Sequence, residues 1–228
     1  MTGIPLLSAF YFGSVEHYAL LARHARVIID IGEHYERQSY RTRTSIIGPN
    51  GVQHLNVQIA RDHGNKMAMR SVGLSYVESW PQQHLHAIRS AYGQTPWFIH
   101  YVDDIEALLL RKYDRLVDLD LATMHLALKW LGLKTHVVVS ETYVEGGVCR
   151  LGGDGCGPVQ EDTPENERVL LHDLRSTFQP KRPMPAEVPA VRDHPQAFAE
   201  RHGHVSRLSI IDLVCNTGPQ ARGLLTSM

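Results

Sequence analysis

The chain has 228 residues, of which 43% are hydrophobic and 21% are charged, and its formal net charge is −1. This composition is typical of a globular protein with one domain, and it lacks the basic excess of non-specific nucleic-acid binding, so no nucleic-acid partner is supported. No apolar run approaches a membrane span in length and the N-terminus lacks the pattern of a signal peptide, so we expect a cytoplasmic protein without a membrane span.

The first elements that the sequence predicts are a helix and a buried strand. Residues 13–24 carry apolar side chains at helical spacing, and the mostly apolar run 26–31 follows them. After Tyr40 the pattern changes, because the turn signal Gly48-Pro49-Asn50-Gly51 precedes residues 54–59, in which polar and apolar side chains alternate. This pattern predicts a β-hairpin with one solvent-facing side.

Helix start signals mark the middle of the chain. Ser79-Trp80-Pro81 provides a capping residue and an early proline, and the apolar spacing beyond it predicts a helix to about Gly93. A second helix is predicted from Asp103-Asp104 through Leu116, because apolar residues recur there at helical spacing. The same spacing over residues 121–131 predicts a third helix.

Loops are predicted to dominate the part of the chain after the third helix. Asp118 or Asp120 is expected to cap that helix, and the apolar run 137–139 beyond it predicts a strand. Residues 146–168 are rich in glycine, proline and acidic residues, and residues 179–191 contain four prolines. Both stretches therefore predict loops.

The predicted elements together indicate an α/β fold. The last of them is the apolar stretch 208–214, which is followed by the helix breaker Gly218-Pro219. We expect a single mixed domain over residues 1–228, with a small sheet and a β-hairpin packed by helices. A variable, loop-rich insert at about 146–191 is a candidate lid. The strands of the sheet are expected from four segments, near Val27, Ser45, Val52 and Val137.

Four stretches of the sequence resemble the WbqC-like family. They are YFGSVEHYALLA near the start, HYERQSYRTRTSIIGPNGVQHLNV in the first third, WPQQHLHAIRSAYGQTPWFIHYVDDI after it and LSIIDLVCNTGP at the end. They occur in the family's order across almost the whole chain, with the region 146–191 as the exception. The resemblance carries no catalytic residue with it.

The resemblance implies a biosynthetic transferase. The family is associated with bacterial surface-polysaccharide gene clusters and with a proposed glycine transferase, so it implies amide formation by acyl or aminoacyl transfer, glycyl transfer among them. The amine that receives the group would belong to a sugar or to a specialised metabolite. The amine of a specialised metabolite is considered because this chain begins with a less aromatic and less proline-rich segment than the polysaccharide-cluster members.

Residues 34–43 pack polar and charged side chains next to a predicted buried strand. Arg41 and Arg43 stand two positions apart, so on a strand they would share one face and could hold a carboxylate or phosphate through bidentate hydrogen bonds. Gln38 and Tyr40 are expected to add an amide and a phenol to substrate binding there. The alternative is a solvated basic edge strand.

His34 is the candidate general base. A histidine side chain can accept a proton near neutral pH, and Asp30 and Glu33 lie close enough in sequence to orient it. The alternative is a structural, hydrogen-bonded histidine.

The catalytic candidates are His34, Tyr40 and, as the third, Asp212. Because it interrupts an apolar stretch, its carboxylate needs a partner, which we expect to be Arg41 or Arg43. The alternatives are a fold-stabilising ion pair and a residue that orients a site arginine. If Arg41 binds substrate, Arg41→Ala should abolish activity and leave the thermal midpoint nearly unchanged.

A second polar cluster lies on the helix predicted after Pro81. His86 with Arg89, and Arg89 with Tyr92, have the spacing of neighbours on one helix face and are further substrate-binding candidates. His84 and His86 would point in different directions, which argues against a metal site formed by that pair. The sequence has no HExxH or CxxC spacing, although its fourteen histidines permit a site assembled from distant segments.

The three cysteines are an odd set without the close spacing of a metal site. Reduced thiols in a cytoplasmic protein fit Cys149, Cys156 and Cys215 better than a disulfide framework does. A disulfide between Cys149 and Cys156 is the alternative. We interpret Cys215 as a small core residue rather than a nucleophile.

No cofactor can be named from the sequence, because it has no GxGxxG, GxxxxGK[ST] or GxSxG motif. The expected partners are a small, anionic substrate and a biosynthetic partner enzyme. Three functions stay open: the transferase, a non-catalytic accessory protein that recognises an anionic sugar or metabolite, and a metal-dependent enzyme with a site assembled from scattered histidines and acids.

Overall fold

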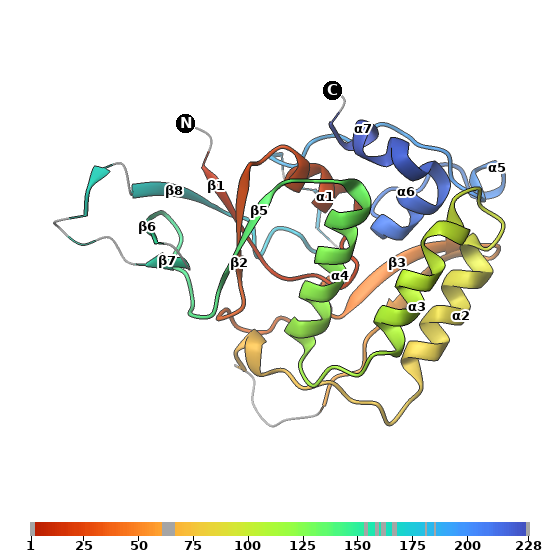
Figure 1. The fold of residues 1–228 in the computed structure, drawn as a ribbon, viewed down its shortest axis with the longest axis horizontal. Coiled ribbons are helices and arrows are strands. Elements are labelled where there is room, and N and C mark those ends of the chain that lie inside the picture. Colours follow the sequence, from red (N-terminus) through yellow and green to blue (C-terminus); the bar gives the residue numbers. More distant parts are fainter. Residues whose placement is uncertain are drawn as a thin grey trace.

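The computed structural model describes residues 3–60, 67–152, 155–157, 160, 163–165, 168–180, 182–184 and 186–226. They form a mixed α/β fold in which a six-stranded sheet is packed with helices and a two-stranded antiparallel sheet stands apart from it. Figure 1 shows the helices gathered at one end of the molecule and the last three strands of the large sheet at the other. The predicted fold class is confirmed.

The large sheet has the strand order β5-β2-β1-β8-β6-β7. Its first four strands are mutually parallel, whereas β6 pairs antiparallel with both β8 and β7. Its strands are β1 (Ile4–Leu7), β2 (Arg26–Asp30), β5 (His136–Ser140), β6 (Val148–Gly152), β7 (Gly155–Gly157) and β8 (Arg168–Asp173). The chain adds β2 and then β5 on one side of β1, and it returns to add β8 on the other side, so the direction of winding reverses between β1 and β8.

The central strands are apolar because both faces of the sheet are covered. Leu6 and Leu7 of β1 are fully buried, and so are Val27, Ile28 and Ile29 of β2. Such continuous apolar runs are typical of parallel strands that are buried on both faces. The strands predicted near residues 26–31 and 137–139 are therefore confirmed, whereas the short β1 was not predicted.

Local signals set most of the helix boundaries. The helices are α1 (Val15–Ala22), α2 (Trp80–Tyr92), α3 (Val102–Leu110), α4 (Leu116–Leu131), α5 (Ala199–His202), α6 (Ile210–Thr217) and α7 (Ala221–Thr226). The Ser14 side chain caps α1 by accepting a hydrogen bond from the His17 N–H, and Gly132 ends α4 with a φ of 60°. In the part of the chain that the structure describes, no helix has the length and apolar character needed to cross a membrane.

The boundary between α3 and α4 was predicted wrongly. The helix expected to reach Leu116 ends at Leu110, and Leu116 begins α4. Hydrogen bonds to distant residues set this boundary. The Leu116 N–H donates to the Val72 main-chain oxygen (2.8 Å), and the Tyr113 N–H donates to the Tyr76 hydroxyl (2.9 Å). Neither Asp118 nor Asp120 is therefore the cap, which is Arg115.

The predicted hairpin consists of β3 (Arg43–Gly48) and β4 (Gly51–Asn56). It was expected to belong to the main sheet, but it forms a sheet of its own. Its Ile46, Ile47 and Leu55 are buried, and β3 contacts α2 and α6. The hairpin therefore supports the helices instead of extending the main sheet.

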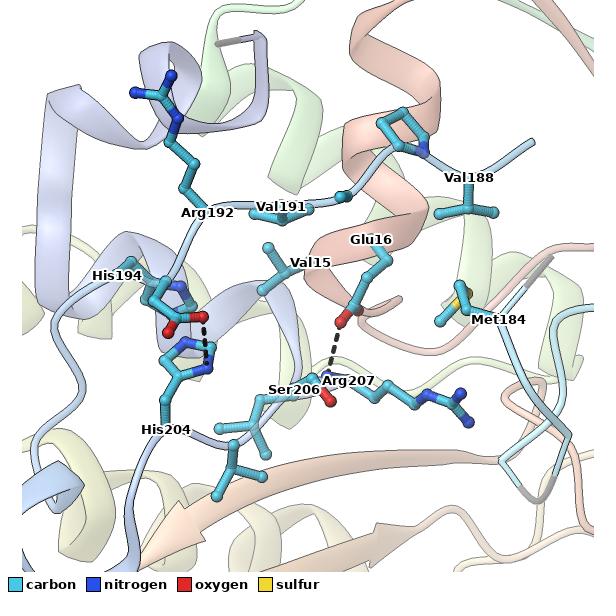
Figure 2. A pocket seen from close by; sticks show the side chains of 15 residues that line it. Val15, Glu16, Met184, Val188, Val191, Arg192, His194, His204, Ser206 and Arg207 are labelled. Atoms are coloured by element: carbon cyan, nitrogen blue, oxygen red, sulfur yellow. Dashed lines mark hydrogen bonds and ion pairs between the residues drawn. The ribbon is translucent and has the colours of Figure 1, made fainter. Parts of the chain in front are cut away.

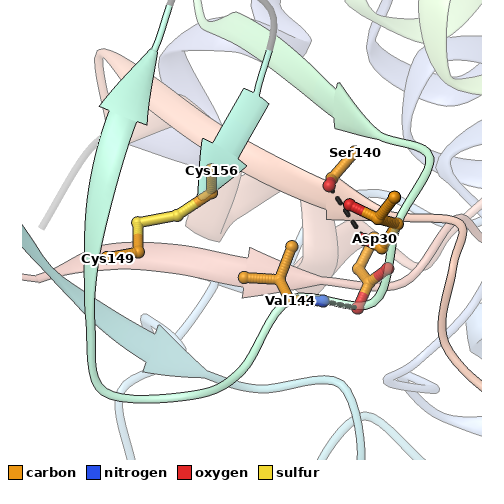
Figure 3. The surroundings of a disulfide bond; sticks show 6 residues. Asp30, Ser140, Val144, Cys149 and Cys156 are labelled. Carbon is orange, nitrogen blue, oxygen red and sulfur yellow. Dashed lines mark hydrogen bonds between the residues drawn. A yellow bond between two sulfur atoms is a disulfide. The ribbon is translucent and has the colours of Figure 1, made fainter. Parts of the chain in front are cut away.

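The stretch at 146–191 contains strands that its composition did not predict. The antiparallel hairpin β6–β7 forms one edge of the main sheet, and β8 completes its parallel part. A disulfide joins Cys149 and Cys156 within this edge (Figure 3), so the expectation of reduced thiols is wrong for this pair. Cytoplasmic location stays a prediction, and the disulfide counts against it because that compartment keeps thiols reduced. Cys215 is buried, as predicted.

Candidate functional site

The carboxyl ends of the four parallel strands meet at one edge of the sheet. Ser8 directly follows β1, and Asp30, Ser140 and Asp173 are the last residues of β2, β5 and β8. The loops that leave β1 and β8 diverge here, because the winding of the sheet reverses between these strands. In open α/β sheets this reversal is the usual place of a ligand-binding crevice. We call this region the switch-point site.

A hollow of about 430 Å³ lies at the switch-point site. The loops after β2, β5 and β8 and the segment before β3 form its walls. Its lining residues are Glu33, His34, Tyr35, Glu36, Arg41, Tyr143, Asp173, Arg175 and Ser176. A hollow of this volume can take a small metabolite.

Arg175 joins the loops at the base of the hollow. Its guanidinium forms an ion pair with the buried Asp30, and it donates to both oxygens of Asp173, from Nε to Oδ1 (2.9 Å) and from Nη2 to Oδ2 (2.5 Å). Asp30 also accepts hydrogen bonds from the main-chain N–H groups of Gly32 (2.8 Å) and Val144 (3.1 Å), the second of which is visible in Figure 3. Burial alone would raise the pKa of Asp173, but its hydrogen bonds with Arg175 hold that pKa below its usual value.

Arg41 is almost completely buried and forms a second junction. Its Nε and Nη2 atoms donate to the two carboxylate oxygens of Glu33 (2.9 and 2.8 Å), and Nη2 also donates to the Ser8 hydroxyl (2.6 Å). The Glu36 carboxylate lies 3.5 Å from Nη1. Arg41 therefore fastens the loop after β2 to the end of β1.

The expected pair of arginines on one strand face is not formed. Arg41 precedes β3, which begins at Arg43, and the two side chains have separate partners. Glu33 binds Arg41, whereas Arg43 donates to the main-chain oxygen of Gln38 (3.1 Å) at an exposed position. Gln38 is also exposed. Of the four residues expected to bind substrate together in this segment, only Arg41 lines the hollow.

The switch-point site has more acidic than basic groups. Two guanidinium groups face four carboxylates, which belong to Asp30, Glu33, Glu36 and Asp173. Asp30 and Glu33 are buried against the arginines, whereas the side chains of Glu36 and Asp173 are 43% and 38% exposed. This balance favours a positively charged ligand group over an anion, because most guanidinium donors already have carboxylate partners.

His34 and Tyr143 stand at the open side of the hollow. Tyr143 is 57% exposed, and the Arg175 guanidinium lies 4.7 Å from the centre of its ring. His34 is exposed, and its ring has no hydrogen bond with the residues that the structure describes. The expectation that Asp30 or Glu33 orients it is wrong, because both carboxylates are bound to arginines.

A comparison with models of protein families gives a match to the WbqC-like protein family over residues 11–151. The chain belongs to this family. Searches of curated proteins and of solved structures returned no match. In this WbqC-like protein the matched part supplies His34, Arg41 and Tyr143 to the hollow, whereas Asp173 and Arg175 lie beyond it.

Asp212 of this WbqC-like protein does not pair with Arg41 or Arg43, as had been expected. It lies in the first turn of α6 and is fully buried, and it accepts hydrogen bonds from His194 (2.8 Å) and Gln196 (3.0 Å). The first turn of α6 faces the segment that carries these two residues, whereas Arg41 binds Glu33 at the switch-point site.

Tyr40 is buried beside Phe10 and does not line the hollow, although it directly precedes Arg41. Its ring lies 5.9 Å from the Phe10 ring, centre to centre, and burial raises the pKa of its hydroxyl. The adjacent Arg41 side chain lines the hollow instead. A catalytic role for Tyr40 stays a prediction without support from its position.

The second predicted cluster lies on α2 and lines none of the hollow's walls. Arg89 is exposed and pairs with Glu106 of α3 (2.6 Å), whereas Tyr92 is buried and its hydroxyl accepts a hydrogen bond from the Ile47 N–H (3.3 Å). The predicted shared face of Arg89 and Tyr92 is therefore wrong, because α2 turns one to solvent and the other to the core. His86 is exposed.

The sequence contained an unused signal for the missed residues. The strand Arg26–Asp30 reads RVIID and the strand Arg168–Asp173 reads RVLLHD, so each is an apolar run that ends in an aspartate. The second of these patterns would have placed Asp173 and Arg175 beside Asp30, at one edge of a parallel sheet. Within the described ranges, no group of three or more histidine, cysteine or acidic side chains could hold a metal ion.

Proposed function

We propose that this WbqC-like protein is a biosynthetic transferase that forms an amide. It moves an acyl or aminoacyl group, glycyl among them, from an activated ester or thioester to the amine of a sugar or specialised metabolite. The observation that carries the proposal is the excess of carboxylates in the switch-point hollow beside an exposed histidine. The family membership supports it.

The amine would bind where carboxylates remain available to it. Each of the four carboxylates already lies against an arginine, and Glu36 and Asp173 are the two whose exposed surface lets an ammonium group approach them. The Arg175 and Arg41 junctions hold the two carboxylates in place, which reduces the cost of ordering them when substrate binds. The anionic substrate that the sequence suggested has less support, because Asp30, Glu33 and Asp173 bind most of the arginine donors. Nη1 of Arg41 is an exception, since it is buried without a hydrogen-bond partner among the described residues.

His34 would act as the proton acceptor. As the amine nitrogen forms its bond to the acyl carbon, the bond to the oxygen or sulfur leaving group breaks and the leaving group keeps the electron pair. The ammonium group that the carboxylates bind loses two protons in this reaction. The His34 imidazole accepts the first, which frees the lone pair for attack, and the leaving group takes the second and departs as the alcohol or thiol. The described part of the 146–191 insert supplies Asp173, Arg175 and Ser176 to the same hollow. Pairing of β8 with β1 and the ion pair of Arg175 with Asp30 hold Asp173 and Arg175 in place, so these two residues are part of the floor of the site and not of the expected lid.

His34→Gln is expected to lower turnover by about 100-fold or more while it changes the free energy of unfolding by less than about 0.5 kcal/mol. The loss follows from removal of the proton acceptor, and the stability is retained because His34 is exposed. The measurement is mass-spectrometric detection of amide products from a panel of amines and activated acyl donors. His125→Gln, at an exposed position of α4, is the matched control and should turn over normally.

Normal turnover by His34→Gln would contradict this role. Binding of amines by the wild-type protein without a product from any donor would instead support the non-catalytic accessory protein, which uses the same hollow for recognition only.

A further inference from the structure

Two features outside the switch-point site are not used by the proposed reaction. One is a hollow of about 410 Å³ beside the first turn of α1, where the Glu16 carboxylate accepts a hydrogen bond from the main-chain N–H of Arg207 (2.7 Å; Figure 2). Among the described residues, none that lines this hollow also lines the switch-point hollow. The other feature is the disulfide between Cys149 and Cys156, which packed side chains connect to the switch-point site (Figure 3).

The disulfide covers a small apolar cluster on one face of the large sheet. Leu6 belongs to this cluster and its neighbour Leu7 to the main core, so the two clusters lie on opposite faces. Among the described residues, no helix contributes a side chain to the small cluster, in which Cys149 is buried and against which Cys156 packs. β7 also contacts β5, from the other end of the strand order. The β6–β7 hairpin therefore covers this face in the place of a helix.

β7 depends on the disulfide for its place in the sheet. It has only three residues, Gly155–Gly157, which is close to the lower limit of strand length. Its two glycines have no side chains to pack, so Cys156 is the residue through which β7 contacts the cluster. Reduction of the disulfide would leave β7 held by its short pairing with β6 and by the Cys156 thiol.

Val144 connects the small cluster to the switch-point site. Its side chain is buried in the cluster with Cys149, and Figure 3 shows it between the disulfide and Asp30. Its main-chain N–H donates a hydrogen bond to the Asp30 carboxylate (3.1 Å). The preceding residue, Tyr143, lines the switch-point hollow and lies against the Arg175 guanidinium. A movement of Val144 therefore affects both the carboxylate that binds Arg175 and a wall of the hollow.

The loop that carries Val144 has no free space toward the loop after β2. A Cβ atom at Gly32 would lie 2.3 Å from the main-chain carbon of Thr142 and 2.3 Å from the main-chain nitrogen of Tyr143. The Ser140 hydroxyl also donates to the Thr142 main-chain oxygen (2.9 Å), which fastens the loop to the end of β5. Because the loop is held at these contacts, a displacement of Val144 moves Tyr143 as well.

We propose that Cys149 and Cys156 form a reversible redox site, at which a low-molecular-weight thiol opens the disulfide and weakens ligand binding in the switch-point hollow. Cys156 is half-buried and Cys149 is buried, so the thiol attacks Cys156. Release of β7 uncovers the cluster, Val144 leaves Asp30, and the wall formed by Tyr143 is lost. The effect on ligand binding rests on the proposed function, whereas the release of Val144 does not.

The exchange balances with two molecules of thiol. The first, as its thiolate, forms a bond to the Cys156 sulfur while the bond between the two cysteines breaks, and the Cys149 sulfur leaves with the electron pair and takes a proton from water. The second thiolate attacks the mixed disulfide, which frees Cys156 and joins the two small thiols in a disulfide. The protein pair is thus reduced by two electrons and the thiols are oxidised by two.

The test compares the oxidised protein with protein in a glutathione buffer that reduces the disulfide, and NMR follows the exchange of main-chain amide protons with deuterium. The Val144 amide should exchange at least tenfold faster in the reduced protein because its bond to Asp30 is lost, whereas amides within α2 should keep their rates. The reduced protein should bind glucosamine at least fivefold more weakly. By linkage, saturating glucosamine should make the disulfide harder to reduce by the same factor.

Cysteine variants provide the controls. Cys149→Ala combined with Cys156→Ala should reproduce the reduced protein and should not respond to glutathione. Cys215→Ala, which removes the buried cysteine outside the disulfide, should behave like the wild type in every measurement. If the double variant does not fold, the glutathione comparison of the wild type still decides the question.

An unchanged Val144 exchange rate after reduction would overturn the proposal, because the disulfide would then be a structural cross-link only. Equal acceleration of the α2 amides would overturn it as well, since reduction would then unfold the whole protein. A disulfide that glutathione leaves intact, or equal glucosamine affinity of the two forms, would also contradict it. If the oxidised protein binds no amine, the proposed function fails, and the Val144 exchange rates alone decide whether the redox site exists.

Discussion

Arg41→Ala is expected to lower the free energy of unfolding by about 3–5 kcal/mol. The substitution removes the partner of the buried Glu33 carboxylate, which would lose the two hydrogen bonds that now satisfy it. It also removes the hydrogen bond to Ser8 at the end of β1. The measurement is a urea titration of the wild type and the variant at the same pH. This expected loss replaces the expectation from the sequence that Arg41→Ala leaves the thermal midpoint nearly unchanged.

The matched control removes both charges together. Arg41→Met combined with Glu33→Leu should recover most of the lost stability, because no unpaired charge is then buried. Arg43→Ala should change the stability by less than about 0.5 kcal/mol, since its contact with Gln38 is exposed. A loss below about 1 kcal/mol in Arg41→Ala would show that the Glu33 carboxylate finds another partner.

Asp120→Leu is expected to raise the free energy of unfolding at pH 8 by about 1–4 kcal/mol. Asp120 lies inside α4 with no exposed surface, and neither carboxylate oxygen has a hydrogen-bond partner among the described residues. Burial raises the pKa of this carboxyl well above its usual value, and Arg41 offsets only part of that increase. A leucine fills similar space without an ionisable group.

The stability gain expected for Asp120→Leu should depend on pH, because Asp120 can take up a proton and leucine cannot. The folded protein holds the Asp120 proton more tightly than the unfolded chain does. The contribution of this protonation to the free energy of unfolding is therefore fully present below about pH 4. It is lost as the pH rises from there toward the raised pKa. The gain in Asp120→Leu over the wild type should therefore grow between pH 5 and pH 8. Asp118→Asn, at an exposed position of the same helix, should show no such trend, and a pH-independent gain would contradict the account.

Elements with strong local signals were predictable from the sequence. The hairpin turn at Gly48–Gly51, the helical spacing of apolar residues in α1 and the apolar run of β2 each depend on neighbouring residues, and all three are present. The boundary between α3 and α4 was not predictable in this way. It depends on hydrogen bonds of Leu116 and Tyr113 to distant residues, which no local pattern indicates.

The candidate site was predicted only in part, for a similar reason. His34 and Arg41 were recognised because charged and polar side chains cluster after a buried strand. Their partners depend on the order of the strands in the sheet, which the sequence did not indicate. Asp30 binds Arg175, 145 positions away, only because β2 and β8 both flank β1.

The most direct test of the switch-point site is a comparison of two sugars with the same ring and opposite charge. Thermal midpoints of the wild type and of Glu36→Gln would be measured with glucosamine and with glucuronate at equal concentrations. The account predicts that glucosamine stabilises the wild type through ligand binding, that glucuronate does not, and that Glu36→Gln reduces the glucosamine effect. Stabilisation by glucuronate that increases in Glu36→Gln would contradict it and would identify an arginine-based anion site instead.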